Sequence, residues 1–230
     1  MRPPALAAVT QCVTWTERPG YARVRCWTPN GTEIQLCGHG LLCSGHCWLQ
    51  HWQIDMVLAM GGIEVPVEYR DGVDWASFPT LQTRDVDTPG WVAELLGQAP
   101  AAAAEAGPAD GYLVAEMATD CDIAALPLPG ATLSSHTRRS LIVTRQVRAC
   151  ESLCGETVQY RYFAPQHGVP EDTATGSAMR VLASYWQRRG AGDELRALQR
   201  SADGGWLLGR VERGRTWVGG RVVEDVGAAL

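Results

Sequence analysis

The sequence contains an internal repeat, and this repeat constrains the fold more than any other feature. Residues 37–48 align without a gap on residues 175–186, at an offset of 138 residues, with Gly at the second position and Trp at the last position of both segments. The same offset pairs Glu33 with Glu171. Each copy runs from an acidic residue through a short loop into an apolar stretch with helical periodicity. The repeat therefore predicts two related halves, each built around one helix.

Around these two helices the sequence pattern is mostly that of β-strands. Short runs rich in Val, Ile, Thr, Tyr and Trp are separated by Gly, Pro or Asp, which is typical of strands joined by turns. We also expect short helices over residues 91–96 and 193–199. The expected strands are residues 21–29, 56–70, 111–118, 139–147, 157–165, 205–213 and 215–225.

Many short strands around one buried helix per half predict an α+β chain with two lobes. Residues 97–110 are the best linker candidate, because Pro and Gly flank an Ala-rich run. We therefore expect an N-terminal lobe over residues 1–96 and a C-terminal lobe over residues 111–230. The last strand of the chain is a candidate to pair with strands of the N-terminal lobe.

The composition narrows the classes of function. All 20 basic residues are Arg, since Lys is absent from the sequence, which excludes enzymes that need a Lys amine, such as Schiff-base aldolases and P-loop nucleotide binders. The net charge of −5 and the scattered Arg residues argue against nucleic acid as a partner. No apolar run reaches the length of a membrane span, and no secretory signal is recognised. We expect a cytoplasmic protein with no membrane partner.

The eight cysteines of the chain raise the possibilities of disulfides and of a metal site. In a chain expected to be cytoplasmic, cysteines are more often buried apolar residues or reactive thiols than disulfides. Zinc sites usually combine two separated clusters of paired ligands, and the other close pair, Cys150 and Cys154, has no flanking His. We predict no metal, although one stretch is rich in possible ligands: Cys37, His39, Cys43, His46, Cys47 and His51.

Each repeat places a Gly at the expected start of its helix, Gly38 in the first copy and Gly176 in the second. The backbone N–H groups of a helix N-terminus and the positive end of the helix dipole attract anions. Alone, either Gly is explained as well by a tight turn. Their repetition at one offset favours binding of a small carboxylate molecule by backbone donors of both halves.

Acidic residues precede both helices. Glu33 lies next to Ile34 and Leu36, where partial burial would raise the pKa of its carboxyl group into a range useful for acid–base catalysis. Glu171 and Asp172 precede the second helix, so that each lobe can supply a carboxylate, although adjacent carboxylates are more often solvated loop charges. Cys37 is a further acid–base candidate, because a helix N-terminus favours its thiolate.

Three segments resemble motifs of the PhzF-like family. EIQLCGHGLLCSGH (33–46) resembles the E-x-P-F-C/A-G-H-A motif, and RYFAPQHGVPEDTATGSA (161–178) resembles R-x-F-A-P-x-x-G-x-x-E-D-P-x-T-G-S-A. QRSADGGWL (199–207) resembles the segment that follows in the family. The resemblance implies the diaminopimelate-epimerase fold: two pseudo-symmetric lobes, each a mixed β-barrel around a central helix, with the active site between them. Family members begin earlier with a further strand, so the first lobe is expected to lack its N-terminal strand.

The resemblance also implies roles for individual residues. Glu33 corresponds to a catalytic glutamate that moves a proton, while Asp172 and Ser177 correspond to groups that contact substrate. Related racemases use two Cys thiols, but the repeat partner of Cys37 is Thr175, which disfavours a two-thiol mechanism. The expected catalytic residues are thus Glu33, Asp172 and Cys37, and the expected substrate-binding residues are Gly38, His39, Thr175, Gly176 and Ser177.

The leading functional hypothesis is a cofactor-independent isomerase or epimerase that moves a proton on a small carboxylate or amino-acid-like metabolite. The resemblance implies a homodimer acting in the biosynthesis of secondary metabolites. One alternative is a hydrolase or lyase of an unsaturated amino-acid-like intermediate. Another is a small-molecule binding protein that has lost catalysis. Product mass separates the enzymatic alternatives, since hydrolysis changes it and isomerisation does not.

Overall fold

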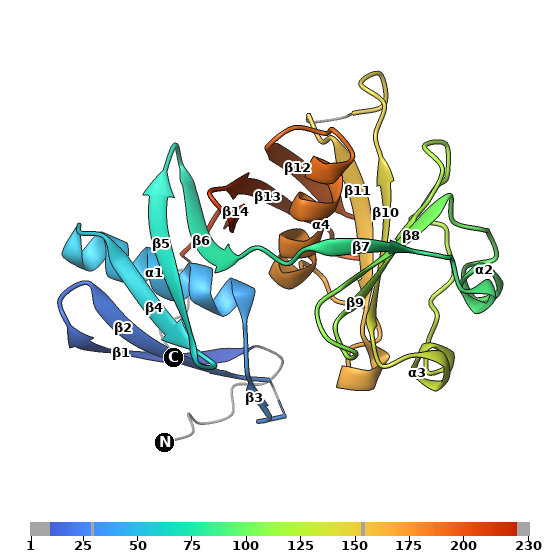
Figure 1. The fold of residues 1–230 in the computed structure, drawn as a ribbon. Helices are drawn as coiled ribbons and strands as arrows, with labels where there is room; N and C mark the ends of the chain where they lie inside the picture. Colours follow the sequence, from blue (N-terminus) through green and yellow to red (C-terminus); the bar gives the residue numbers. More distant parts are fainter. Residues whose placement is uncertain (1–9, 29, 153–154, 225–230) are drawn as a thin grey trace. The chain divides into compact units, whose positions relative to one another are not determined.

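The computed structural model describes residues 10–28, 30–152 and 155–224. The chain divides into two units: the first contains the chain up to Phe78 and the segment from Trp217 onward, and the second runs from Pro79 to Thr216. Strands in mixed sheets dominate both units, and helices are few (Figure 1). This confirms the α+β class predicted from the strand-rich pattern.

The first unit forms a mixed sheet that packs on one long helix, α1 (Gly38–Trp52). Its strand order is β1-β2-β4-β5-β6-β14, with β3 added beside β2. Strands β2 and β4 are parallel, whereas β1–β2, β4–β5 and β5–β6 are antiparallel. The strands are β1 (Gln11–Arg18), β2 (Tyr21–Trp27), β3 (Glu33–Ile34), β4 (Met56–Met60), β5 (Ile63–Arg70), β6 (Val73–Pro79) and β14 (Arg215–Gly220).

The second unit has the strand order β13-β12-β11-β10-β9-β8-β7. The pairs β11–β12 and β9–β10 are parallel, and the other pairs are antiparallel. The strands are β7 (Thr83–Val86), β8 (Ala102–Ala106), β9 (Tyr112–Glu116), β10 (Ser140–Gln146), β11 (Val158–Phe163), β12 (Glu194–Gln199) and β13 (Gly205–Glu212), and the helices are α2 (Gly90–Leu96), α3 (Thr132–His136), η1 (Pro165–His167) and α4 (Gly176–Arg188).

The two repeated segments form α1 and α4, and their N-termini have the same geometry. The N-cap residue is Cys37 in α1 (φ −117°, ψ 101°) and Thr175 in α4 (φ −109°, ψ 98°), both extended. In each helix the N-cap carbonyl accepts the first helical bond, at 3.0 Å and 3.1 Å respectively. The sequence repeat is therefore a repeat of local backbone structure.

Glycine allows a close approach between helix and sheet in both units. A Cβ on Gly45 of α1 would lie 3.1 Å from a methyl group of Val67 on β5. In the second unit the glycine is on the strand, where a Cβ on Gly209 of β13 would meet Met179 and Ala183 of α4. Close packing buries α4 over most of its length, with eight buried residues from Ala178 to Trp186.

A separate apolar core lies under α2 and α3 in the second unit. It joins these short helices to β9, β10 and β11 and places fully buried side chains such as Leu133, Leu141 and Phe163 in contact. Burial of such side chains is the main favourable term in folding. This core holds β11 in place, and β11 leads through η1 to the loop before α4.

Most of the expected elements are present, with two differences. Residues 193–199, expected as a helix, form strand β12, because pairing with β11 and β13 outweighs local helix propensity. The Ala-rich part of the expected linker, residues 97–110, contributes strand β8 inside the second unit, where small side chains pack between β7 and β9. The helix over residues 91–96 is confirmed as α2. Pro29 and Asp225, at the ends of expected strands, lie outside the described residues.

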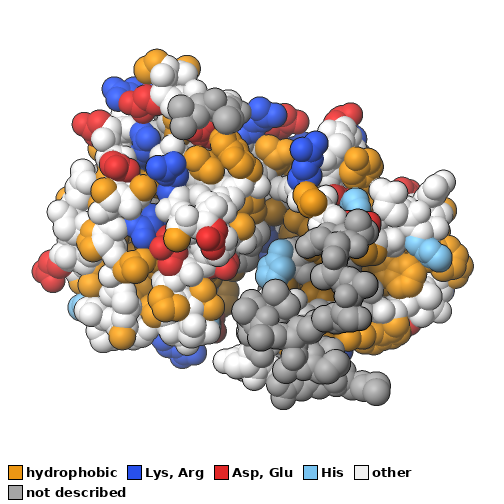
Figure 2. Space-filling view, turned by 180° about the vertical axis from the view of Figure 1, so that it is seen from behind, with side chains coloured by type: hydrophobic (Ala, Val, Ile, Leu, Met, Phe, Trp, Pro, Cys, Tyr) orange, Lys and Arg blue, Asp and Glu red, His pale blue; other side chains and the backbone are white. Residues whose placement is uncertain are grey.

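The described surface shows no concentration of one charge sign on the face drawn in Figure 2, where Arg and acidic side chains are interspersed. Within the described ranges, no helix has the length and apolar character needed to cross a bilayer.

Candidate functional site

Glu33 lies on the short strand β3 and is held by an ion pair. Its two carboxylate oxygens accept hydrogen bonds from Nε and Nη2 of Arg25, at 2.8 Å and 2.7 Å. Register places Glu33 opposite Trp27 on β2, so that Glu33 and Arg25 share one face of the sheet. Cys26 and Ile34 form the neighbouring pair and belong to the opposite face.

The expected rise in the pKa of Glu33 is wrong. The side chain is 38% exposed, and the hydrogen bond from Arg25 lowers the pKa of the carboxyl group below its usual value. Sequence reasoning placed Glu33 beside apolar neighbours, but the cross-strand neighbour Arg25 decides its environment. Glu33 is therefore an ionised carboxylate at neutral pH and a poor proton donor.

The ion pair gives a testable pH effect. Replacing Arg25 by Gln should raise the pKa of Glu33 toward the ordinary value of a glutamate, because the bidentate bond to the carboxylate is lost. A lowered pKa in the folded state means that the stabilisation exists above the unfolded pKa and is lost as pH falls. NMR titration of the Glu33 side chain in both proteins measures the shift. An unchanged pKa in the variant would mean that the Arg25 contact does not form in solution.

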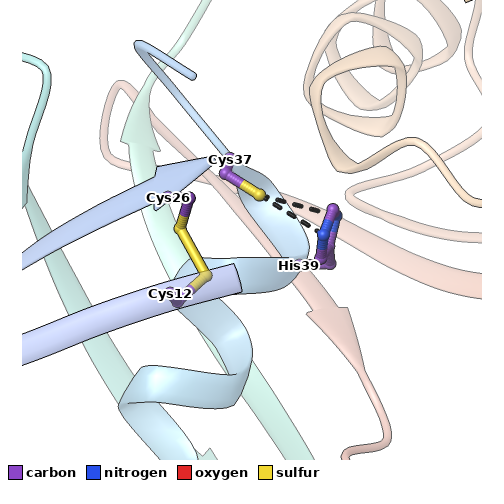
Figure 3. The surroundings of a disulfide bond; sticks show 4 residues. All are labelled: Cys12, Cys26, Cys37 and His39. Atoms are coloured by element: carbon purple, nitrogen blue, oxygen red, sulfur yellow. Dashed lines mark hydrogen bonds between the residues drawn. A yellow bond between two sulfur atoms is a disulfide. The ribbon is translucent and has the colours of Figure 1, made fainter. Parts of the chain in front are cut away.

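The N-terminus of α1 carries a thiol and an imidazole in contact. Sγ of Cys37 lies 3.4 Å from Nε2 and 3.6 Å from Nδ1 of His39. Figure 3 marks these contacts with dashed lines. Cys37 is 3% exposed, whereas His39 is exposed to solvent. The Cys37 side chain makes no capping bond to the helix. The arrangement places an imidazole, the side chain best suited to proton transfer near neutral pH, at a helix N-terminus.

A disulfide between Cys12 and Cys26 lies beside this thiol. The two residues are directly opposed on β1 and β2, and Figure 3 shows the bond next to the first turn of α1. The expectation that the cysteines are apolar residues or thiols is therefore wrong for this pair. Cys37, Cys43, Cys47, Cys121 and Cys150 are outside the disulfide, and Cys154 lies outside the described residues.

Gly40 is required where α1 meets the three sulfur atoms. A Cβ at this position would lie 2.5 Å from Sγ of Cys26, 2.6 Å from Sγ of Cys12 and 3.1 Å from Sγ of Cys37. We expect Gly40→Ala to destabilise the protein by about 1–3 kcal/mol through overpacking, which exceeds the gain of about 0.5–1 kcal/mol from replacing a helical Gly by Ala.

Chemical denaturation of Gly40→Ala measures this difference, with Gly90→Ala as the control. Gly90 likewise lies in the first turn of a helix, α2, but a Cβ there would have no atom within 4 Å. The control variant should be as stable as the parent or slightly more stable. Equal free energies of unfolding for the two variants would show that the three sulfur atoms can accommodate a methyl group at Gly40 without destabilising the protein.

The N-terminus of α4 is organised by a buried glutamine. Oε1 of Gln199 accepts a bond from the backbone N–H of Thr175 at 2.7 Å, and its Nε2 donates to Oγ1 of Thr175 at 3.2 Å and to the carbonyl of Asp172. The Thr175 hydroxyl donates to Oδ2 of Asp172 at 2.7 Å. Thr is a good N-cap residue, yet here its hydroxyl binds Asp172 and does not cap the helix. The network fixes the Asp172 carboxylate beside an uncapped helix start.

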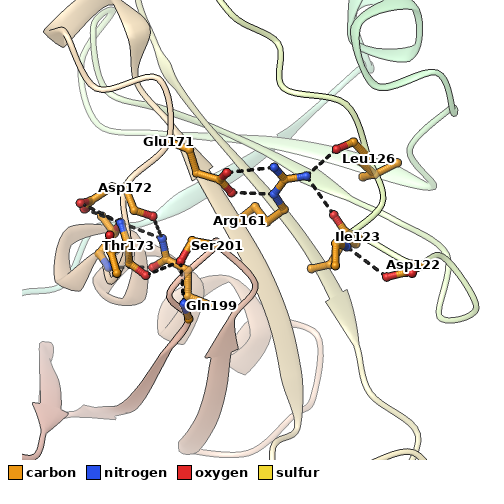
Figure 4. Close-up of polar contacts among 12 residues, drawn as sticks. Asp122, Ile123, Leu126, Arg161, Glu171, Asp172, Thr173, Gln199 and Ser201 are labelled. Atoms are coloured by element: carbon orange, nitrogen blue, oxygen red, sulfur yellow. Dashed lines mark hydrogen bonds and ion pairs between the residues drawn. The ribbon is translucent and has the colours of Figure 1, made fainter.

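Two serines, Ser201 and Ser177, make further hydrogen bonds in this region, and Figure 4 shows the first of them. Ser201 donates to the carbonyl of Thr173 at 2.7 Å, which ties the loop before α4 to the segment after β12. Ser177, in the first turn of α4, hydrogen-bonds the hydroxyl of Tyr162, and burial raises the pKa of that phenol to about 12. Tyr162 therefore stays protonated at neutral pH and acts as a hydrogen-bonding group.

Glu171 has a structural role. Its carboxylate accepts two bonds from Arg161, at 2.6 Å and 2.9 Å, and Nη1 of Arg161 donates to the carbonyls of Ile123 at 3.2 Å and Leu126 at 2.6 Å (Figure 4). The Arg161 side chain is 6% exposed. Glu171 thus neutralises a buried Arg, which leaves Asp172 as the acidic residue of this loop that belongs to the Thr175 network.

The His and Cys residues of the α1 segment have separate environments. His46 contacts Asp74 through Nδ1 at 2.9 Å, while Cys43 and Cys47 are exposed on the helix. In the described part of the chain, no three His, Cys, Asp or Glu side chains are placed to hold a metal ion.

Sequence reasoning identified the residues at both helix starts but missed Gln199, Tyr162 and Arg25. Gln199 was recognised only as part of a motif, and nothing local showed that its amide faces a loop 24 residues earlier. In the first unit the structure brings together Cys37, Gly38 and His39, and in the second unit Asp172, Thr175, Gly176 and Ser177.

The mixed α+β fold is similar to those of solved structures described as a PhzF family protein, a predicted epimerase and a probable proline racemase. A predicted epimerase from Pseudomonas aeruginosa aligns with a TM-score of 0.63 at 16% identity, over 95% of this chain and 80% of that one. A PhzF family protein from Enterococcus faecalis aligns with a TM-score of 0.77 at 22% identity, over 92% of this chain and 78% of that one. These likenesses establish the fold.

Sequence comparison identifies the family. The family model described as phenazine biosynthesis-like protein matches residues 9–215. An uncharacterized isomerase of Pseudomonas aeruginosa is 33% identical over 201 residues, which covers 85% of this chain and 71% of that protein. A phenazine biosynthesis-like domain-containing protein of Rattus norvegicus is 27% identical over 199 residues, or 79% of this chain and 67% of that protein. The chain belongs to the phenazine biosynthesis-like family, and its relatives include proteins named as isomerases.

Proposed function

We propose that the protein is a cofactor-independent isomerase that moves a proton on a small carboxylate or amino-acid-like metabolite. His39 is the acid–base group supplied by the first unit, with Cys37 as its contact. Asp172 is the acid–base or orienting group supplied by the second unit. The sequence prediction gave the proton-transfer role to Glu33, and the ion pair with Arg25 is the reason for assigning the role to His39.

A single observation carries the proposal: two repeated helix starts with matching backbone geometry each hold a titratable side chain at an N-terminus that no N-cap side chain caps. The N-terminal dipole and backbone donors favour a bound carboxylate, and they also favour the negative charge that develops when a neighbouring C–H is deprotonated. Membership of an isomerase- and epimerase-like family supports the same reaction class. The residues named above require no cofactor for the proposed reaction.

Each residue has a defined part in this reaction. His39 removes a proton from carbon and returns it, because an imidazole exchanges protons near neutral pH. Gly38 and Gly176, the first residues of the two helices, let the helix starts approach the substrate carboxylate. Thr175 holds the Asp172 carboxylate, and Gln199 holds the Asp172 carbonyl and the Thr175 hydroxyl. Ser177 contacts the substrate.

Deuterium uptake tests the proposal. The protein is incubated in D₂O with a pool of amino acids, unsaturated carboxylates and related intermediates, and each compound is followed by mass spectrometry and NMR. Deuterium incorporation with no other mass change supports isomerisation and identifies the substrate. Gain of water or loss of a fragment would support a hydrolase or lyase. Ligand binding without exchange or turnover would support a binding protein. A cytoplasmic homodimer acting in secondary metabolism is part of the proposal, and light scattering tests the dimer.

A further inference from the structure

Three sulfur atoms of the first unit surround one point in the structure. The disulfide sulfurs of Cys12 and Cys26 and the thiol of Cys37 all lie within 3.1 Å of the position that a Gly40 Cβ would occupy. A side chain at Gly40 would contact all three sulfurs, and Figure 3 shows the Cys37 thiol and the disulfide beside the start of α1. A thiol beside a disulfide is the arrangement required for thiol–disulfide exchange.

The two disulfide sulfurs differ in their surroundings. Cys26 lies on the internal strand β2 and has no exposed surface. Cys12 lies on β1, which ends the sheet order of the described strands, and it is an exposed residue. A thiolate released at Cys12 belongs to an exposed residue of the edge strand, whereas a thiolate released at Cys26 would be buried at considerable cost. This difference makes Cys26 the sulfur under attack and Cys12 the leaving group.

Cys37 is suited to the attacking role. It is the N-cap residue of α1 and contacts the His39 imidazole at 3.4 Å, and both a helix N-terminus and a neighbouring His favour a thiolate. With 3% exposure, Cys37 is shielded from direct attack by reagents in solution. Its accessible reaction partner is the disulfide beside it.

We propose that Cys12, Cys26 and Cys37 form a thiol–disulfide exchange site that responds to small-molecule thiols of the glutathione class. The Cys37 thiolate attacks Sγ of Cys26, a Cys26–Cys37 bond forms, and the Cys12–Cys26 bond breaks. Cys12 leaves as a thiolate and takes up the proton that Cys37 gave up through His39. This step involves no net oxidation.

Reduction by thiols in solution takes place on the Cys12–Cys26 form, in which a small thiol attacks the sulfur of Cys12 on the exposed edge strand and the Cys12–Cys26 bond breaks. Two molecules of a small thiol reduce the protein disulfide to two protein thiols and leave as one small-molecule disulfide; the reverse reaction reoxidises the protein. Small thiols in solution therefore change the redox state of the buried residues Cys26 and Cys37 by reacting at Cys12. If the proposed function holds, the sulfur in contact with His39 is a thiol in one form and part of a disulfide in the other, so exchange would also alter the acid–base group.

Disulfide mapping of the full chain tests the site without any substrate, so its result is independent of the proposed function. The protein is equilibrated at a series of ratios of reduced to oxidised glutathione, quenched in acid and alkylated with N-ethylmaleimide. Cleavage after Arg25 and after Glu33 places Cys26 and Cys37 in different fragments. Linked fragments are then identified by mass spectrometry, and fragmentation distinguishes Cys37 from Cys43 and Cys47.

The decisive variant is Cys12→Ser. With the leaving group absent, oxidised glutathione should convert most molecules to the Cys26–Cys37 linkage. Cys37→Ser should show only the Cys12–Cys26 linkage, and Cys150→Ser, which removes an exposed cysteine of the second unit, should leave the wild-type pattern unchanged. A folded Cys12→Ser protein in which Cys26 and Cys37 remain alkylated separately, or carry glutathione separately, would overturn the proposal.

The wild-type protein provides a second measurement if Cys12→Ser does not fold. At intermediate glutathione ratios a fraction of molecules should carry N-ethylmaleimide on Cys12 together with linked Cys26 and Cys37. Absence of that species at every ratio would refute exchange. Its appearance in a Cys43→Ser, Cys47→Ser double variant would show that the exposed thiols of α1 are not needed.

Discussion

His39→Gln is expected to lower the rate of deuterium exchange into the substrate by roughly 10²–10⁴-fold, the usual contribution of a positioned acid–base group. Gln keeps a polar side chain of similar size at the start of α1 but cannot carry a proton to or from carbon. Because the carboxylate of the substrate binds to backbone donors, KM should change much less than kcat. Exchange rates at several pH values should also lose the inflection caused by the imidazole.

Two controls distinguish His39 from its competitors. His51→Gln removes an exposed His in the last turn of the same helix and should leave exchange unchanged. Glu33→Gln breaks the ion pair with Arg25 and should reduce exchange only severalfold, by loosening β3. If Glu33→Gln abolishes exchange and His39→Gln does not, Glu33 is the proton shuttle, as the sequence alone indicated.

The sequence predicted the parts of the structure that depend on local pattern. The repeat located both helix starts, and the matching extended N-caps Cys37 and Thr175 show that the equivalence extends to backbone angles. Alternation and turn residues located the strands. Residues 193–199 were misassigned because their composition suits a helix, and only pairing with β11 and β13 makes them a strand.

The parts that could not be predicted depend on which strands become neighbours. Cys12 and Cys26 are 14 residues apart, and their bond requires the register that opposes them on β1 and β2. Arg25 controls the pKa of Glu33 through the pairing of β2 with β3. Gln199 reaches the Asp172 loop because β12 lies parallel to β11. The spacing of residues in the sequence does not indicate these contacts. The residue types at the site could therefore be predicted, but the neighbours that set their pKa values and hydrogen bonds could not.

Arg161→Met should produce the largest loss of stability among single changes near the site. The guanidinium group, with 6% of its side chain exposed, satisfies the Glu171 carboxylate and the carbonyls of Ile123 and Leu126. Met fills similar space but leaves a largely buried carboxylate without its partner. Breaking a buried ion pair in this way costs about 3–5 kcal/mol. Equilibrium urea unfolding, followed by Trp fluorescence and circular dichroism, measures the change.

Removing both charges should restore part of the lost stability. In Arg161→Met, Glu171→Leu no buried charge remains unpaired, and replacement of a buried pair by apolar residues is often neutral, so most of the loss should be recovered. Arg148→Met is the control, because this Arg also pairs with a Glu but is 55% exposed, and its partner Glu151 is 30% exposed against 16% for Glu171. It should change stability little. If Arg161→Met is as stable as the control, Glu171 must be solvated in the folded protein. Glu171 would then be available as a second carboxylate beside Asp172, which would reopen its role in the reaction.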